Sequence, residues 1–184
     1  MDKITNYNLA IKEVKESPFD VFDHLDESFR HNKKFVLEAV SIYGFIFQYL
    51  DDDFRSDKEI LLRAISKDPS CIEYASEDLR KDKEIALKCV TNQWYTLEYI
   101  DESLKKDEDI ILTAIASKLL DSVESLKFAD ISLRNNKAFM KKAINIHPLV
   151  IKYASDELKD DQELAEELLF KSKFLIKYLI LLYL

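Results

Sequence analysis

The chain has 184 residues, of which 47% are hydrophobic and 34% are charged, and its formal net charge is −8. This balance is typical of an ordered protein with a substantial core rather than a disordered chain. The negative charge argues against direct DNA binding, and against nonspecific attachment to anionic membranes, because both need a basic surface. One Gly and three Pro are present. Since sheets and tight turns use these residues heavily, their scarcity predicts an all-α fold with short connections.

A ring side chain recurs along the chain with a nearly constant period. The intervals are 25 residues, except for one of 29, and the positions are His24, Tyr49, Tyr74, Tyr99, Phe128, Tyr153 and Tyr178. A period in this range predicts a solenoid, here a single domain over residues 1–184 of about six or seven stacked helical hairpins. The copies are expected near residues 4–28, 29–53, 54–78, 79–103, 104–132, 133–157 and 158–184.

The first helix of each copy is predicted to begin after an Asn or Asp, whose side chain accepts hydrogen bonds from free amides of a helix start. In the first copy Tyr7 occupies this column, and Asn6 or Asn8 is expected to cap instead. A column of small residues follows on the apolar face, where neighbouring helices are expected to approach closely. The caps are Asn32, Asp57, Asp82, Asp107, Asn136 and Asp161, and the small residues are Ala39, Ala64, Cys89, Ala114 and Ala143.

The second helix of each copy is predicted to be about as long as the first, at about ten residues. It begins near the column Gly44, Pro69, Trp94, Val123 and Pro148, where Pro suits a first helical position, and Asp68 and Ser122 are candidate caps. The apolar residues Ile72, Ala75 and Leu79 then follow at helical spacing. We expect the recurring tyrosines to hold the hairpins together. The longer interval places four extra residues near Lys118–Ser122, in a loop or a helix end.

Two stretches carry a family resemblance: residues 57–65, Asp-Lys-Glu-Ile-Leu-Leu-Arg-Ala-Ile, and residues 74–85, beginning Tyr-Ala-Ser-Glu-Asp-Leu-Arg. They resemble the bacterial repeat family called domain of unknown function 4116, and the resemblance runs from about Ile4 to Tyr178. It weakens at the first copy and at the insertion. The resemblance implies tandem helical repeats, including in some proteins of intracellular pathogens. It implies no activity and no catalytic residues.

The sequence lacks the residue patterns that most enzyme active sites require. Phosphate-binding loops need several glycines, and the chain has only Gly44. His24, His31 and His147 lack metal-ligand spacing, and Cys71 and Cys89 stand at apolar positions typical of reduced core cysteines. We therefore expect a non-enzymatic protein with no catalytic residue, cofactor or metal.

The best candidates for partner binding are Asp51, Asp52 and Asp53, with Trp94 and Tyr95. The three aspartates are the densest part of a recurring acidic edge, followed in each copy by a basic column. Two interpretations stay open: a solvated surface with weak ion pairs between copies, or an acidic edge that meets a basic partner. Trp94 is either a binding hot spot or a filler between hairpins. The basic column is Arg30, Arg55, Arg80, Lys105, Arg134 and Lys159.

The last eleven residues, Phe174–Leu184, are apolar except for Lys177. Lysines interrupt the stretch, so we do not expect a transmembrane span. The alternatives are a final helix buried on the last hairpin, self-association through residues 174–184, or attachment to a membrane surface. The first twenty residues show no secretory signal, which favours a cytoplasmic protein, or one delivered into a host cell if it is an effector.

The sequence thus predicts a scaffold that binds another protein, of unknown identity, along one face of the repeats. The alternative is an acidic inhibitor that occupies the nucleic-acid channel of a nuclease or defence enzyme, as anti-CRISPR-like proteins do. An enzyme with an unrecognised site is the remaining class.

Overall fold

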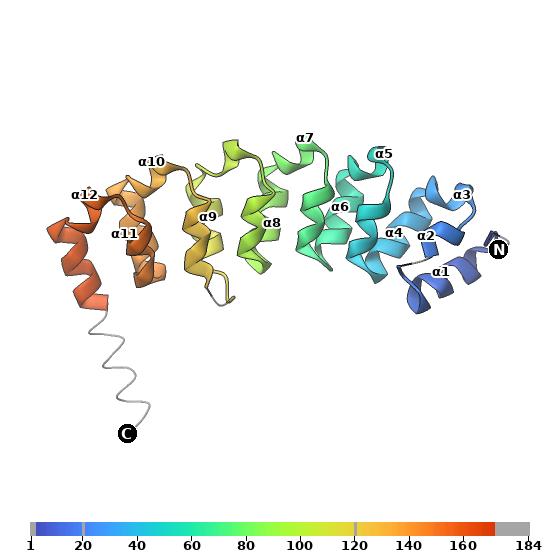
Figure 1. Ribbon diagram of the computed structural model, residues 1–184, viewed down its shortest axis with the longest axis horizontal. Coiled ribbons are helices and arrows are strands. Elements are labelled where there is room, and N and C mark those ends of the chain that lie inside the picture. Colours follow the sequence, from blue (N-terminus) through green and yellow to red (C-terminus); the bar gives the residue numbers. More distant parts are fainter. Residues whose placement is uncertain (1–2, 20, 120, 172–184) are drawn as a thin grey trace, which may run out of the picture. The chain divides into compact units, whose positions relative to one another are not determined.

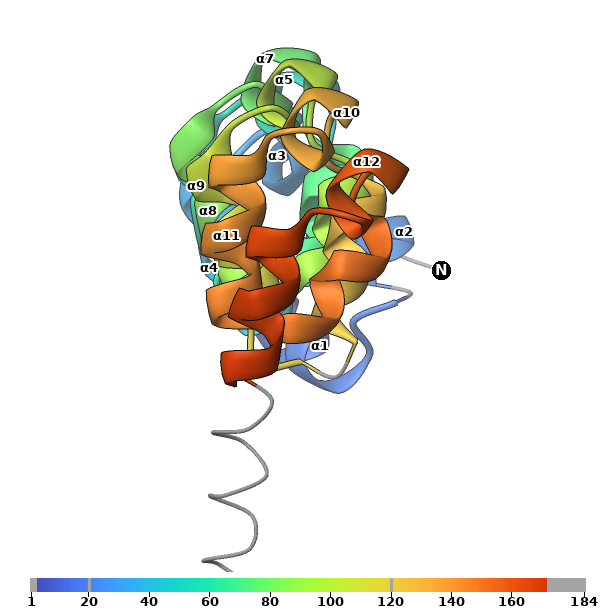
Figure 2. The ribbon, with the colours of Figure 1, turned by 90° about the vertical axis from the view of Figure 1, so that its left-hand side faces the viewer.

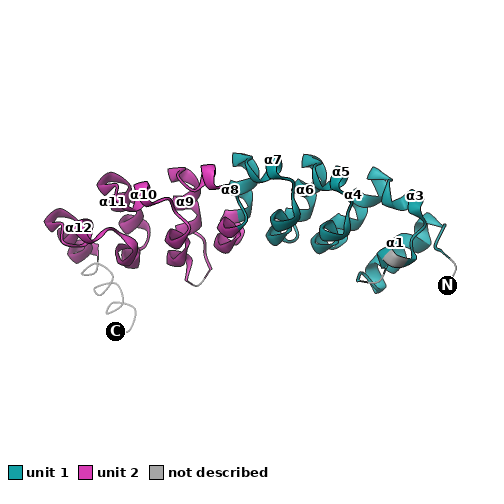
Figure 3. Ribbon diagram, turned by 45° about the horizontal axis from the view of Figure 1, so that its top comes forward, with its two compact units in different colours: residues 1–89, 99–101 teal, residues 90–98, 102–184 magenta. Residues whose placement is uncertain are grey.

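The computed structural model describes residues 3–19, 21–119 and 121–171 (Figure 1). Within these ranges the regular elements are helices, and one isolated parallel bridge joins Ile4 to Leu25. The fold is therefore of the all-α helical-repeat class that the sequence predicts. Two compact units are present: unit 1 is Met1–Cys89 with Tyr99–Asp101, and unit 2 is Val90–Glu98 with Glu102–Leu184 (Figure 3).

Unit 1 stacks repeats of a longer helix, a 3₁₀ helix and a helix of one turn. The one-turn helices α3, α5 and α7 lie at one end of the longer helices (Figure 1). The bounds are α1 (Tyr7–Glu16), α2 (Val21–His24), α3 (Glu27–Arg30), α4 (Lys33–Ile42), η1 (Gly44–Tyr49), α5 (Asp52–Arg55), α6 (Lys58–Ile65), η2 (Pro69–Tyr74), α7 (Glu77–Arg80) and α8 (Lys83–Asn92), which runs on into unit 2.

Unit 2 repeats the same sequence of elements and ends, among the described residues, with a helix over residues 162–171. Here too the one-turn helices α10 and α12 lie at one end of the longer ones (Figure 2). The bounds are η3 (Trp94–Glu98), η4 (Glu102–Leu104), α9 (Glu108–Ile115), η5 (Ser122–Lys127), α10 (Ile131–Arg134), α11 (Lys137–Ile146), η6 (Pro148–Tyr153) and α12 (Asp156–Lys159).

The longer helices form because each has a cap and one apolar face, as predicted. The Asp57 carboxylate accepts hydrogen bonds from the amides of Glu59 and Ile60, and in the first copy Asn6 caps α1. The small-residue column is fully buried at Ala39, Ala64, Cys89, Ala114 and Ala143. It lies where α4 packs on α6 and where α9 packs on α11. The small alanine and cysteine side chains there allow close helix contact.

The second helix differs from the prediction of about ten residues. In unit 1 it divides into η1 and α5, or η2 and α7, separated by an extended residue such as Leu50 (φ −78°, ψ 155°) or Ala75 (φ −71°, ψ 153°). Counted from one helix cap to the next, Arg55 belongs to the preceding copy, and the amide that follows the break donates to it: the Ser76 amide donates to the Arg55 carbonyl at 3.2 Å. A continuous helix would use that amide for itself. The break therefore exchanges an intrahelical bond for one between copies.

The recurring tyrosines are expected to hold the hairpins together, and two of them are more exposed than core residues. Tyr49 is 45% exposed and Tyr74 is 37% exposed, so these rings lie at the rim of the core. Tyr49 still links two copies, because its ring stacks on that of Phe22 at a centroid distance of 6.4 Å. Tyr49 and Tyr74 thus lie at the edge of the core, whereas Phe47 and Ile72 of the same 3₁₀ helices are fully buried.

The insertion near Lys118–Ser122 forms the connection between α9 and η5, of which residue 120 lies outside the described ranges. Asp121 takes a left-handed conformation (φ 63°). The sequence predicts that Ser122 caps the next helix, and this prediction is wrong. Ser122 is the first residue of η5, and its hydroxyl donates to the Ile115 carbonyl at 2.9 Å. The extra residues give the chain room to turn, and the serine satisfies a helix-end carbonyl.

Candidate functional site

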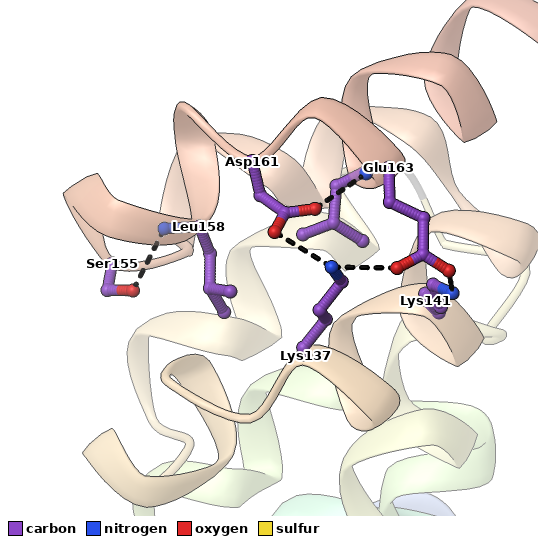
Figure 4. Close-up of polar contacts among 7 residues, drawn as sticks. Lys137, Lys141, Ser155, Leu158, Asp161 and Glu163 are labelled. Carbon is purple, nitrogen blue, oxygen red and sulfur yellow. Dashed lines mark hydrogen bonds and ion pairs between the residues drawn. The ribbon is translucent and has the colours of Figure 1, made fainter.

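The polar residues of the repeat first bind one another. In unit 2 the lysine that opens α11 reaches the cap of the next copy: Lys137 Nζ lies 2.8 Å from Asp161 Oδ2 and 2.7 Å from Glu163 Oε2 (Figure 4). We call this contact a lysine rung. Lys141, one turn further along α11, also binds Glu163. In unit 1, Lys33 with Asp57 and Glu59, and Lys58 with Asp82 and Glu84, form rungs at 2.7–2.9 Å.

Each rung shares an aspartate with a helix cap. One carboxylate oxygen of Asp57 accepts from the amides of Glu59 at 2.9 Å and Ile60 at 3.2 Å, and the other accepts from Lys33 at 2.7 Å. Burial raises the pKa of Asp57, but the lysine and the two amides together outweigh it and hold the pKa below its ordinary value. The charged carboxylate therefore fixes both a helix start and the neighbouring copy.

Where a copy lacks acidic acceptors, the preceding copy lacks the lysine. Copy six has Asn136 at the cap and Ala138 two positions later, and copy five has Glu108 where a rung lysine would stand. Glu108 instead accepts a hydrogen bond from Lys142 at 2.7 Å. A rung therefore forms where a lysine follows one cap and an aspartate forms the next cap, 24 residues later. Our sequence reasoning missed it, although comparing the residue after each cap would have revealed the column.

At several positions the acidic edge and the basic column pair within a single turn. Lys105 lies 2.5 Å from Glu102, and Lys159 lies 3.0 Å from Asp156. In both pairs the two residues are three apart in the chain and the acidic side chain is exposed. Each pair therefore contributes little to stability. They place positive charge beside much of the edge and reduce its negative potential locally.

The structure places Asp51, Asp52 and Asp53 at the start of α5 in unit 1, all exposed. Asp52 pairs with Arg55 within the same turn. An oxygen of Asp51 lies 3.6 Å from His31 Nδ1, and among the described residues no ion pair is recorded for Asp53. Three consecutive carboxylates with this few cations form the most negative part of the edge. Such a surface suits a basic partner.

Trp94 and Tyr95 stand in unit 2, at the start of η3, and therefore apart in the chain from the three aspartates. The half-buried Trp94 ring contacts the rings of Tyr95 at 6.0 Å and Phe128 at 6.4 Å between centroids. Tyr95 is 39% exposed. The indole thus packs against the next ring of the recurring column, whereas the phenol offers more surface to a partner.

A groove that sequence reasoning did not find crosses α4, α6 and α8 in unit 1. Its volume is about 650 Å³, and it carries the exposed cations Arg63, Lys67 and Lys88 beside Ser41 and Leu62. Lys88 follows Arg63 by one period of 25 residues, so the two occupy the same column. The lining also includes Lys58 and Glu59, which belong to the lysine rungs described above, so cations outnumber acids in the groove.

The remaining residues with reactive or metal-binding groups have structural surroundings. Cys71 and Cys89 are buried free thiols, and desolvation raises the pKa of each to about 12, which keeps both protonated. His147 Nδ1 accepts from the Leu149 amide at 3.3 Å and so caps η6. Within the described ranges, no cluster of three metal-binding side chains occurs, and no helix is long and apolar enough to cross a membrane.

The predicted self-association segment, residues 174–184, lies outside the described residues. The last described helix covers residues 162–171, and an apolar groove lies beside it.

Comparisons with known proteins found no match among curated proteins and none among solved structures. One family model, described as a domain of unknown function (DUF4116), matches repeatedly, over residues 9–55, 32–80, 57–105, 82–120, 107–159 and 136–180. These matches follow the repeat period that the caps, rungs and small-residue column define, and the chain belongs to this family.

Proposed function

We propose that the chain is a non-enzymatic helical-repeat scaffold that binds a basic surface of another protein along the face that carries Asp51, Asp52 and Asp53. One observation carries the proposal. The repeated polar residues are used internally as caps and rungs, whereas these three carboxylates are exposed at a place where the copies differ. Solenoids present such differences along a shared face, and a partner reads them.

The partner can be identified by photo-cross-linking from the proposed face, with a position on another helix as the control. A photoreactive amino acid at position 53 is compared with one at Lys12, an exposed residue of α1. We expect a partner that cross-links from position 53 and not from position 12. The triple substitution of Asp51, Asp52 and Asp53 to Asn is then expected to weaken binding of that partner about tenfold, or about 1.4 kcal/mol.

The matched control is Asp156→Asn with Glu157→Gln, which neutralises the same edge in another copy. It should leave affinity nearly unchanged if the dense acidic run is the recognition element. A second substitution pair, Trp94→Ala and Tyr95→Ala, asks whether unit 2 contributes; because Trp94 packs on Phe128, helix content is checked by circular dichroism. Equal affinity of the wild type and the aspartate variant would remove Asp51–Asp53 from the interface.

The second candidate is an acidic inhibitor of a nucleic-acid enzyme. The same exposed run of carboxylates favours it, because closely spaced negative charges compete with phosphates for a basic channel. If the captured partner is such an enzyme, an oligonucleotide should displace the chain, and the affinity should fall steeply between 50 and 200 mM salt. Binding to the captured partner that an oligonucleotide does not displace would leave the scaffold proposal and remove this one.

A further inference from the structure

Unit 2 has an apolar groove beside its last described helix. The groove has a volume of about 540 Å³ and is lined by Pro148, Leu149 and Ile151 of η6 and by Ala165, Leu168 and Leu169 of the helix over residues 162–171. All of these side chains are apolar, and Leu149 is 63% exposed. Exposed apolar surface of this kind is characteristic of a docking site.

The corresponding place in unit 1 shows what fits between these two walls. There η2 packs both on η1, the 3₁₀ helix of the preceding copy, and on α6, the longer helix of its own copy. Its inward side chains Cys71 and Ile72 are buried. By repeat position, η6 corresponds to η1 and the helix over residues 162–171 corresponds to α6. The apolar groove therefore corresponds to the place that η2 fills.

The residue numbers identify the matching segment. One period after Pro148–Tyr153, whose residues read Pro-Leu-Val-Ile-Lys-Tyr, come residues 173–178, which read Lys-Phe-Leu-Ile-Lys-Tyr. The positions equivalent to the buried pair Cys71 and Ile72 are Leu175 and Ile176, both apolar. The last match of the family model ends at residue 180, so the family pattern includes this segment.

We propose that residues 173–178 are the 3₁₀ element of a seventh copy and that they occupy the apolar groove of the same chain. The segment has the required length, register and buried residue types, and the groove has the two walls that hold such an element in unit 1. The apolar end of the sequence then completes the core of the repeat array instead of binding a membrane or a second chain.

The test uses two substitutions in the full-length chain. Ile176→Asp puts a charge at the position of buried Ile72. Leu182→Asp puts the same charge at the column of Asp78 and Glu157, where acids already stand. We expect Ile176→Asp to lower the melting temperature by roughly 5–10 °C, to speed amide exchange in η6 and to raise binding of an apolar dye, whereas Leu182→Asp behaves as the wild type. Ile176→Ala repeats the comparison if Ile176→Asp does not fold.

Three outcomes would overturn the proposal. Equal behaviour of the two aspartate variants would show that position 176 is not buried. A wild-type dimer in sedimentation velocity that Ile176→Asp converts to a monomer would give the groove to a second copy. Binding of the wild type to phosphatidylcholine–phosphatidylglycerol vesicles that Ile176→Asp and Leu182→Asp both abolish would instead assign the segment to the bilayer surface.

Discussion

Among single residues, Glu124 in η5 shows how strongly neighbouring copies polarise one another. Its carboxylate binds Lys127 in its own helix and Lys152 in η6, the latter at 2.6 Å. The pKa of Glu124 falls to about 2 because Lys127, Lys152 and Tyr153 all hydrogen-bond to its charged form. The Glu124 carboxylate therefore joins two copies of unit 2, and the strength of this interaction depends on pH.

We predict that Glu124→Gln removes a pH-dependent part of the stability. A carboxyl with a lowered folded-state pKa stabilises the protein above its ordinary pKa of 4.5, and this contribution disappears as the pH falls towards about 2. The gap in unfolding free energy between wild type and variant should be full at pH 7 and should close between pH 4.5 and about 2. Urea titrations at several pH values measure it. Glu157→Gln, at an exposed residue, is the control, and a gap independent of pH would contradict the assignment.

Residue types that act locally were predictable from the sequence, and those that act across copies were not. Asp57 and Asn32 were identified as caps because a cap bonds amides two or three residues away. Lys33 and Lys58 were overlooked because their partners lie 24–26 residues along the chain. Periodicity does contain that information, but only when the columns are compared in pairs. The exposure of Tyr49 depends on which of several neighbouring columns is buried, and the period alone does not decide this.

At the scale of the element, Gly44 marks a close approach between the 3₁₀ helix η1 and the end of the next longer helix, α6. A Cβ at this position would lie 2.5 Å from the Ala64 carbonyl oxygen and 2.9 Å from the Asp68 amide nitrogen. Both are backbone atoms, which cannot turn away as a side chain end can. Other copies have Pro69 or Val123 in this column, so the tight contact is particular to η1 and the end of α6.

We therefore predict that Gly44→Ala destabilises the protein by about 1–3 kcal/mol, the usual cost of overpacking a close contact. Chemical denaturation followed by circular dichroism measures the change. Gln48→Ala, on a half-buried residue of the same 3₁₀ helix, is the control and should cost less. A Gly44→Ala protein as stable as the wild type would mean that η1 and α6 can separate without loss.

The divided second helix was beyond local sequence rules for a related reason. Ile72, Ala75 and Leu79 fit one face of a continuous helix, and nothing in that spacing signals a break at Ala75. The break is stabilised by a bond from the Ser76 amide to a carbonyl of the preceding copy. An isolated hairpin would lack that carbonyl, so this part of the fold belongs to the stack and not to the single copy.

At the scale of the whole molecule, equivalent contacts recur at each step of the period, so one copy should be removable. Deleting residues 57–81 joins Ser56 to Asp82. Lys33 then meets Asp82 and Glu84 in place of Asp57 and Glu59, and the Arg55 carbonyl meets the Asp101 amide in place of that of Ser76. These bonds at the old boundary thus have chemically equivalent replacements at the new one.

We predict that this 25-residue deletion keeps the helix content per residue and a single cooperative melting transition, with some loss of stability because fewer neighbouring contacts remain. Deleting residues 57–69 instead joins Ser56 to Ser70, which offers Lys33 no cap aspartate and shifts every later column by half a period. That variant should lose most of its helix signal. If both deletions unfold alike, copies are not interchangeable, and stability depends on features particular to each copy, as at Gly44. If only the half-period deletion unfolds, the period itself is the unit of stability, and the positions where copies differ are free to serve a partner.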